Sequence, residues 1–320
     1  MQTAPKVSLT ILFLLAFASP SAPQEKGTTP AMELLDAARL ADVRVVAERS
    51  FKIQANIKLE QGKGVVSQGS YVLVWGSPTQ WHEEFSFPDF HQVRVSGPGG
   101  VWERREPYFL SLRMWQLMQA LSFYGRFKLQ GEESAGKIKR SKKNGEELRC
   151  IEIARHSPVR EFCFHEDVPE LASEHYLPSD RHYEFADYRT IGTKFFPGGI
   201  TVFDGKTLAA EFVVSNVEEI PSASTSLFEQ PARAEWRPWC ASPDVGGDPL
   251  TPIYSRLTKN KGVATLYGTI GTDGQWHGVH VLESGGQNHD AEVLEALKKE
   301  RWKPSSCNGT PIPIETVFRR

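Results

Sequence analysis

The stretch Phe51-Lys52-Ile53-Gln54-Ala55-Asn56-Ile57-Lys58-Leu59 places an apolar side chain at every second position. Strict alternation of this kind predicts a long strand with one face buried and the other in water. Comparable runs follow at residues 69–75, 81–87 and 91–96, and turn-forming sequences such as Gly76-Ser77-Pro78 separate them. The sequence therefore predicts an antiparallel β domain that contains this stretch as a strand.

Two segments of the same region have helical spacing instead. Apolar residues recur every three or four positions in 31–43 and again in 110–127. This spacing predicts two helices, the second of them amphipathic and packed on the sheet. Strands resume at 192–203 and 207–217, and hairpin dipeptides stand at Asn144-Gly145 and Asp204-Gly205.

The strand-rich region ends in an aperiodic stretch, which places a domain boundary near Trp236. The first domain is therefore expected to span 31–235 and a second module 236–320. The second module is expected to be a small α+β unit. Its predicted elements are a helix at 253–260, strands at 262–270 and 275–282, a helix at 290–301 and a strand at 312–318.

Composition excludes several classes of protein. The chain has 320 residues, 40% of them hydrophobic, and a formal net charge of -2. A nucleic-acid-binding protein normally carries a basic field, and a disordered chain carries fewer apolar residues. We therefore expect a folded protein with no nucleic-acid partner.

The N-terminus has the pattern of an export signal. Lys6 precedes an apolar run at 7–18 that ends in Ala16-Phe17-Ala18, a small-x-small cleavage sequence. The run is shorter than the roughly 20 residues that cross a bilayer. The sequence predicts a cleaved signal peptide at 1–18 and a linker at 19–30, with an uncleaved anchor as the alternative. The mature protein is then exported and soluble.

Export permits disulfide bonds. Cys150 and Cys163 lie in two alternating runs around a turn at His156-Ser157-Pro158, which fits a cross-strand bridge. Cys240 and Cys307 then pair by elimination. Free thiols, or another of the three connectivities that four cysteines allow, are the alternatives.

An ordered series of residues runs through 250–320. It comprises Pro252, Tyr254, Ser255, Gly262, Val263, Ala264, Asp273, Gly274, Val279, Val281, Ser284, Gly285, Gly286, Asp290, Ala291, Ala296, Leu297, Trp302, Lys303, Pro304, Gly309, Pro311, Ile312 and Pro313. In this order the series resembles the TonB C-terminal domain family, although His289 stands where that family usually has an apolar residue. The resemblance implies docking to an outer-membrane receptor or envelope protein by strand addition.

The expected docking edge is the last strand. Its residues are Pro313, Ile314, Glu315, Thr316, Val317 and Phe318. The competing interpretation is an ordinary sheet edge that Arg319 and Arg320 protect from pairing. A motor-coupled transducer also needs a retained membrane helix and a long Pro-rich span, whereas here the N-terminal run looks cleaved and a β domain replaces the span.

The first domain has a helix, long alternating strands, the segment 69–75 followed by Ser77-Pro78, a second helix and closing hairpins. Over 30–230 this order resembles the lipoprotein-carrier group typified by LolA. The resemblance implies an antiparallel half-barrel that wraps over helices and encloses an apolar cavity for a lipid or lipoprotein. Its expected lining is Tyr71, Trp75, Phe85, Phe87, Met114, Trp115 and Met118. A sandwich or closed barrel with a filled core is the alternative.

Patterns of catalysis and metal binding are missing from the sequence. The polar stretch 165–182 contains five acidic residues and three histidines, but no His-x-x-x-His or Cys-x-x-Cys spacing occurs. No nucleophile elbow or phosphate-binding loop is present either. We therefore expect no metal, no cofactor and no enzymatic activity. The basic run 137–143 is expected at an exposed hairpin tip, with contact to anionic lipid headgroups or an acidic partner as the sharper hypothesis.

Together these features predict a non-catalytic periplasmic binding protein of a Gram-negative-type envelope. The C-terminal module would dock a partner by strand pairing, and the β domain would hold an apolar ligand or lipoprotein. The alternatives are a scaffold without a ligand, a transport component of the energy-transducer type, and an undetected hydrolase.

Overall fold

The computed structural model describes residues 29–45, 49–62, 65–107, 110–122, 126–129, 132–155, 158–177, 181–221, 225–229, 237–240, 263–307 and 309–319. The predicted signal peptide at 1–18, most of the linker at 19–30 and the predicted helix at 253–260 lie outside these residues. None of the described helices has the length and apolar character needed to span a bilayer.

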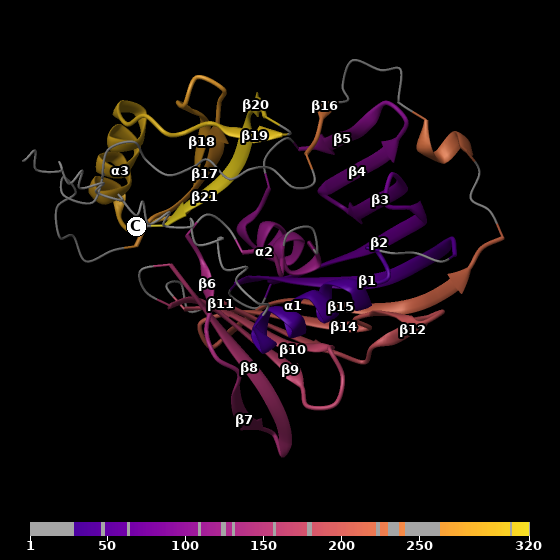
Figure 1. The fold of residues 1–320 in the computed structure, drawn as a ribbon. Coiled ribbons are helices and arrows are strands. Elements are labelled where there is room, and N and C mark those ends of the chain that lie inside the picture. Colours follow the sequence, from indigo (N-terminus) through magenta and orange to yellow (C-terminus); the bar gives the residue numbers. More distant parts are fainter. Residues whose placement is uncertain are drawn as a thin grey trace, which may run out of the picture.

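The fold is mainly β, as predicted, with one large antiparallel sheet and a small separate sheet in the C-terminal module (Figure 1). The strands of the large sheet are β1 (Phe51–Gly62), β2 (Val65–Ser77), β3 (Gln80–Phe87), β4 (Phe90–Gly97), β5 (Gly100–Glu106), β6 (Ser134–Ala135), β7 (Lys139–Lys143), β8 (Glu146–Ala154), β9 (Pro158–His165), β10 (Leu171–Tyr176), β11 (Arg181–Ala186), β14 (Gly199–Asp204), β15 (Thr207–Glu219) and β16 (Arg237–Pro238). A short hairpin of β12 (Arg189–Ile191) and β13 (Lys194–Phe196) and a 3-10 helix at Thr225–Phe228 accompany it.

The large sheet is an open one. Its fourteen strands run in the order β16-β5-β4-β3-β2-β1-β15-β14-β11-β10-β9-β8-β6, with β7 paired to β8. The central pair joins β1 to β15, so the strand that opens the domain lies beside the strand that closes it. The predicted strand at 192–203 is wrong in one respect: β13 and β14 are separate, because Pro197 between them has no N–H to donate to a ladder.

Two helices contribute side chains to the core of the β domain. Helix α1 (Pro30–Ala41) begins at Thr29, whose side chain accepts a hydrogen bond from the Met32 amide. Helix α2 (Leu112–Leu121) begins at Ser111 in the same manner and packs on the sheet, as its amphipathic pattern predicts. It is shorter than the predicted 110–127, because the chain turns to extended geometry at Ser122.

The C-terminal module has its own core. Its sheet has the order β18-β17-β21, formed by β17 (Thr265–Ile270), β18 (Trp276–Glu283) and β21 (Ile314–Arg319). Helix α3 (Gln287–Lys299) packs on one face, and Trp276, Val293, Leu297 and Trp302 fill the space between them. A hairpin of β19 (Ser305–Cys307) and β20 (Thr310–Ile312) completes the module.

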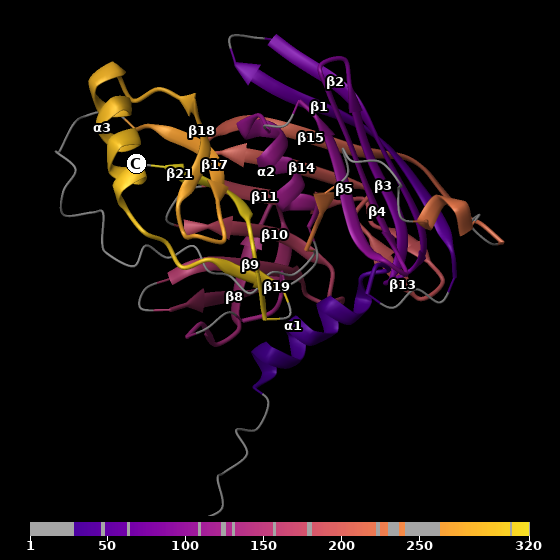
Figure 2. The same cartoon turned by 90° about the horizontal axis from the view of Figure 1, so that it is seen from above.

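The other face of that small sheet packs against the β domain. Tyr267 of β17 is 1% exposed and belongs to the main core, and Leu282 and Val317 pack against the same core. Figure 2 shows the three strands of the module beside α2 and the large sheet. The module therefore covers part of the β domain instead of standing apart on its linker.

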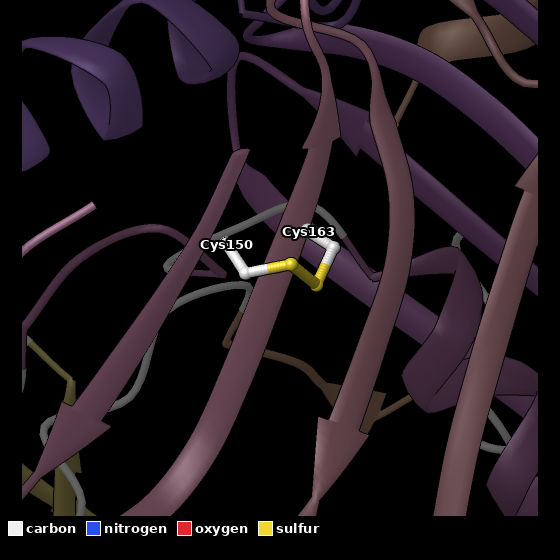
Figure 3. The surroundings of a disulfide bond; sticks show 2 residues. All are labelled: Cys150 and Cys163. Carbon is white, nitrogen blue, oxygen red and sulfur yellow. A yellow bond between two sulfur atoms is a disulfide. The ribbon is translucent and has the colours of Figure 1, made fainter. Parts of the chain in front are cut away.

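Both predicted disulfide pairs are present. Cys150 of β8 and Cys163 of β9 stand directly opposite each other in the ladder and form one bridge (Figure 3). Cys240 bonds to Cys307 of β19. Cys240 falls within the predicted module 236–320, but it follows β16, which pairs with β5 of the large sheet. The second bridge therefore joins a segment attached to the large sheet to β19 of the module.

Candidate binding sites

Strand β21 is, with β18, one of the two outer strands of the small sheet. It pairs with β17 from Ile314 opposite Ile270 to Arg319 opposite Thr265, and its other edge pairs with no strand in the described part of the chain. Pro313, directly before the strand, is exposed. An outer strand of this kind offers backbone groups to an added strand.

The side chains of the predicted edge are divided between two faces. Ile314 and Phe318 pack in the core under α3. Val317 and Glu315 are directed at the β domain, and Glu315 reaches Arg105 of β5. The contact between Glu315 and the β domain is a feature that the sequence pattern does not reveal.

Arg105 is the centre of a buried charge cluster at this junction. Its guanidinium donates to both carboxylate oxygens of Glu315 at 3.1 and 2.9 Å, and to Glu103 at 3.0 Å. Further bonds go to the Gln92 side chain at 2.7 Å and to the Tyr267 hydroxyl at 3.2 Å. The Arg105 and Glu103 side chains are 1% and 0% exposed, so both charges depend on these partners.

A second arginine extends the cluster into the β domain. Arg94 donates to Glu103 at 2.7 Å and to Glu83 at 3.3 Å, and it lies 4.2 Å from the ring centroid of Trp239. The Tyr71 hydroxyl donates to Glu83 at 3.0 Å. We refer to Glu83, Arg94, Glu103, Arg105 and Glu315 as the junction cluster; each of its five charges has a partner of opposite sign.

The residues predicted to line an apolar cavity lie in the main core. Tyr71, Trp75, Phe85, Phe87, Met114 and Met118 are all at most 9% exposed. Their side chains contact one another or their neighbours; the Tyr71 and Phe85 rings are 4.9 Å apart, for example. Trp115 differs, because it is only half-buried on α2. In this conformation the space between α2 and the sheet is filled by side chains.

A small hollow lies near the C-terminal end of α1. Its volume is about 40 Å³, and its lining includes Arg44, Arg126, Phe127, Phe185 and Tyr188. None of the seven predicted lining residues contributes to it. A space of this size holds a few water molecules, not an acyl chain.

The inner face of β10 and β11 carries polar side chains that sequence reasoning missed. Glu174 stands opposite Tyr183 in the ladder, and Tyr176 stands opposite Arg181. Arg126 donates to Glu174 at 2.6 Å. We refer to Arg126, Arg160, Glu174, Tyr176, Arg181 and Tyr183 as the inner-face cluster. The sequence of 181–186 contains a signal for this. Arg181 stands two and four positions before the apolar residues Tyr183 and Phe185, so in a strand all three side chains point to the same face.

The polar stretch at 165–182 gathers no metal site in the part of the chain that the structure describes, where no group of three potential ligands comes together. Glu174 is paired with Arg126, and His175 and His182 pack ring against ring with centroids 5.8 Å apart.

The basic run 137–143 forms much of an exposed hairpin arm. Strand β7 turns at Asn144-Gly145, both with positive φ. Three of its cations pair with carboxylates, namely Lys139 with Glu152, Arg140 with Glu166 and Lys143 with Glu184.

Comparison with known proteins finds a match for the C-terminal module. Residues 251–319 match the family model of the C-terminal domain of the Gram-negative bacterial TonB protein. No curated protein matches the chain in sequence.

Among solved structures, a LolA superfamily protein from Nitrosomonas europaea aligns with 63% of this chain and 99% of its own, at 10% identity and a TM-score of 0.40. A DUF1329 family protein from Desulfovibrio piger aligns with 63% of this chain and 98% of its own, at 14% identity and a TM-score of 0.46.

Proposed function

We propose that the chain is a non-catalytic binding protein of the bacterial periplasm, whose C-terminal module docks an envelope or outer-membrane partner by adding a strand to β21. The observation that supports this most is the outer position of β21 in a module that matches the TonB C-terminal family. Strand addition obtains its affinity from backbone hydrogen bonds, so it needs an available edge more than a particular side chain. The two disulfides agree with an oxidising compartment.

The packing of the module restricts how a partner can approach. One face of the small sheet is covered by α3 and the other by the β domain. An incoming strand therefore meets the module along an edge, in the plane of the sheet. Docking on the α3 face would first have to displace α3, and docking on the other face would first have to separate the junction cluster.

Site-directed photo-crosslinking tests the docking edge. A photoreactive residue replaces Pro313, which is exposed beside β21, and a matched variant carries it at Val281 on β18, the opposite edge of the sheet. We expect a crosslink to an outer-membrane protein from position 313 and none from position 281. Crosslinking from position 281 alone, or from neither position, contradicts docking at β21.

For the β domain we propose an apolar ligand or a lipoprotein segment held between α2 and the inner face of the sheet. The half-buried Trp115 on α2 supports this position, because it is the partly exposed member of an otherwise buried apolar set. For the ligand to enter, α2 has to move away from the side chains that now contact its residues Met114 and Met118. Native mass spectrometry of the purified mature chain tests the proposal: co-purifying lipid is expected, and a consistently ligand-free protein supports a scaffold.

A further inference from the structure

The inner-face cluster contains three arginines but they are not equivalent. Arg126 pairs with Glu174 at 2.6 Å, and Arg160 pairs with Glu133 at 2.8 Å. Arg181 has no carboxylate partner among the described residues. Its guanidinium lies instead against three aromatic rings, 4.7 Å from the centroid of Trp115, 4.6 Å from Tyr176 and 5.7 Å from Tyr183.

Polar atoms of this cluster lack hydrogen-bond partners in the described part of the chain. They are the Arg181 Nε, the Tyr183 hydroxyl and one carboxylate oxygen of Glu174. Tyr183 and Glu174 are 0% and 1% exposed, so these groups are well removed from solvent. A buried polar group without a partner costs about 1–3 kcal/mol, and native proteins rarely keep several together. Two of the three atoms, the Arg181 Nε and the Tyr183 hydroxyl, are donors on the same strand, and they indicate a place that receives an acceptor from outside the chain. The Glu174 oxygen is itself an acceptor and gives no support for an anion.

The chemistry of the cluster selects the charge of that group. Burial raises the pKa of Tyr176 to about 12, and burial raises the pKa of Tyr183 further. Both tyrosines therefore keep their protons at neutral pH, and the Tyr183 hydroxyl and the Arg181 Nε are both available donors. Two carboxylates neighbour Arg181 on the paired strands, and each is paired with another arginine: Glu174 with Arg126, and Asp204, which stands opposite Arg181 in the ladder, with Arg113. An incoming anion therefore meets a guanidinium that has no ion-pair partner among the described residues.

The surroundings select the rest of the ligand. Arg181, Trp115 and Tyr176 are all half-buried, so this group of side chains borders the protein surface. Trp115 is also on α2, whose other face is packed in the apolar core. One unpaired cation among aromatic rings suits a single anionic head on an apolar chain. Nucleic acids and phosphorylated peptides are instead bound by clusters of several cations.

We propose that Arg181, framed by Trp115, Tyr176 and Tyr183, is the head-group site for an amphiphile with one carboxylate or phosphate group. The apolar chain then runs from Trp115 between α2 and the sheet. This inference rests on the apolar-ligand part of the proposed function and names the class of ligand for that site.

The test measures binding of three probes to the mature full-length protein by isothermal titration calorimetry, below the concentration at which the probes aggregate. The probes are dodecanoate, which has both head and chain, dodecanol, which lacks the charge, and acetate, which lacks the chain. We expect dodecanoate to bind at least about tenfold more tightly than dodecanol, since a charge-assisted contact is involved. Acetate is expected to bind far more weakly than either.

Two substitutions at one position assign the effect to the guanidinium. R181Q is expected to reduce dodecanoate affinity to that of dodecanol, and R181K, which keeps the charge, to retain part of the preference. R140Q is the matched control, because it makes the same charge change on the exposed hairpin and is expected to leave binding unchanged. Circular dichroism verifies that each variant is folded.

The outcomes separate the two proposals. Equal affinity for dodecanoate and dodecanol in the wild type, or an R181Q protein with unchanged preference, overturns the head-group site while the apolar-ligand proposal stands. Acetate binding as tightly as dodecanoate overturns the amphiphile and leaves a simple anion site. Failure of both long-chain probes to bind overturns the apolar-ligand proposal itself. If R181Q does not fold, the R181K variant and the three probes with the wild-type protein still test the head-group site.

Discussion

The junction cluster and the inner-face cluster use the same residue types in opposite ways. In the junction cluster, both arginines contact two carboxylates each, and the Tyr71 hydroxyl has an acceptor in Glu83. In the inner-face cluster, Arg181 lies against aromatic rings without an ion-pair partner among the described residues, and the Tyr183 hydroxyl has no partner among the described atoms. A fully paired buried network holds a structure in one arrangement, whereas an incompletely paired one has capacity for a ligand. From this comparison we infer that the junction cluster stabilises the structure and that the inner-face cluster binds a ligand.

The largest expected effect comes from the disulfide that reinforces the junction. Cys240 and Cys307 are separated by 67 positions, against 13 for Cys150 and Cys163. Closing a longer loop in the unfolded chain costs more entropy. Replacing Cys240 and Cys307 by serine is therefore expected to lower the free energy of unfolding by about 4 kcal/mol. Replacing Cys150 and Cys163 by serine is expected to lower the free energy of unfolding by about 3 kcal/mol. Denaturant titration of both double variants measures the order, and an equal loss contradicts the chain-entropy argument.

Breaking the junction cluster directly is expected to have the next largest effect. Arg105→Met leaves Glu315 without its bidentate partner, and it removes from the fully buried Glu103 one of its two arginine partners while Arg94 stays. Uncovering a buried charge in this way costs about 3 kcal/mol, the lower end of the usual range because Arg94 remains. Glu315→Gln is the control. Its carboxylate is 18% exposed, so the loss is expected to be about 1 kcal/mol. A larger loss for Glu315→Gln than for Arg105→Met contradicts the assignment of Arg105 as the centre.

Alkaline pH is expected to destabilise the protein through Tyr176 of the inner-face cluster and through Tyr71 and Tyr267, which are hydrogen-bonded to the junction cluster. Burial, and then the Glu174 charge, raise the pKa of Tyr176 to about 12, while burial raises the pKa values of Tyr71 and Tyr267 above their usual range. Between about pH 10 and pH 12 the unfolded chain has lost these protons and the native protein has kept them. The free energy of unfolding is therefore unaffected below about pH 10 and falls above it. Urea titrations across this range, with tyrosinate absorbance, measure the fall; constant stability contradicts the burial of the hydroxyls.

Much of the β domain was predictable because local pattern and burial agree there. The alternation in 51–59 identifies β1, and the Asn144-Gly145 dipeptide identifies the turn of the β7–β8 hairpin. Strand β5 escaped prediction for a physical reason. Its inward positions are Glu103 and Arg105, so its sequence has no apolar alternation, although both side chains are buried. Arg94, the partner of Glu103, lies nine positions away on the neighbouring strand β4, whereas Glu315, the partner of Arg105, lies 210 positions away on β21.

The candidate sites were predictable to different degrees, because some depend on local sequence and others on contacts between distant segments. The outer strand β21 follows from local sequence and from the family pattern, both of which are contained in residues 250–320. The contact of Glu315 with Arg105 spans two modules, and the setting of Arg181 joins α2 to β10 and β11. Such pairings depend on tertiary packing and leave no spacing rule in one sequence.

The smallest expected effect gives the sharpest contrast between the two clusters. Tyr71→Phe removes a hydroxyl that donates to Glu83 at 3.0 Å, and we expect it to lower the free energy of unfolding by about 1–2 kcal/mol. Tyr183→Phe removes a buried hydroxyl with no partner in the described structure, and we expect stability to be unchanged or to rise by up to about 1 kcal/mol.

Denaturant titration of the two variants without ligand measures this difference in sign. A loss in Tyr183→Phe as large as that in Tyr71→Phe contradicts the division between a structural and a binding cluster. If the Tyr183 hydroxyl serves the amphiphile head, the same variant binds dodecanoate more weakly while being at least as stable. That combination distinguishes a binding residue from a structural one, because a packing defect lowers stability and affinity together.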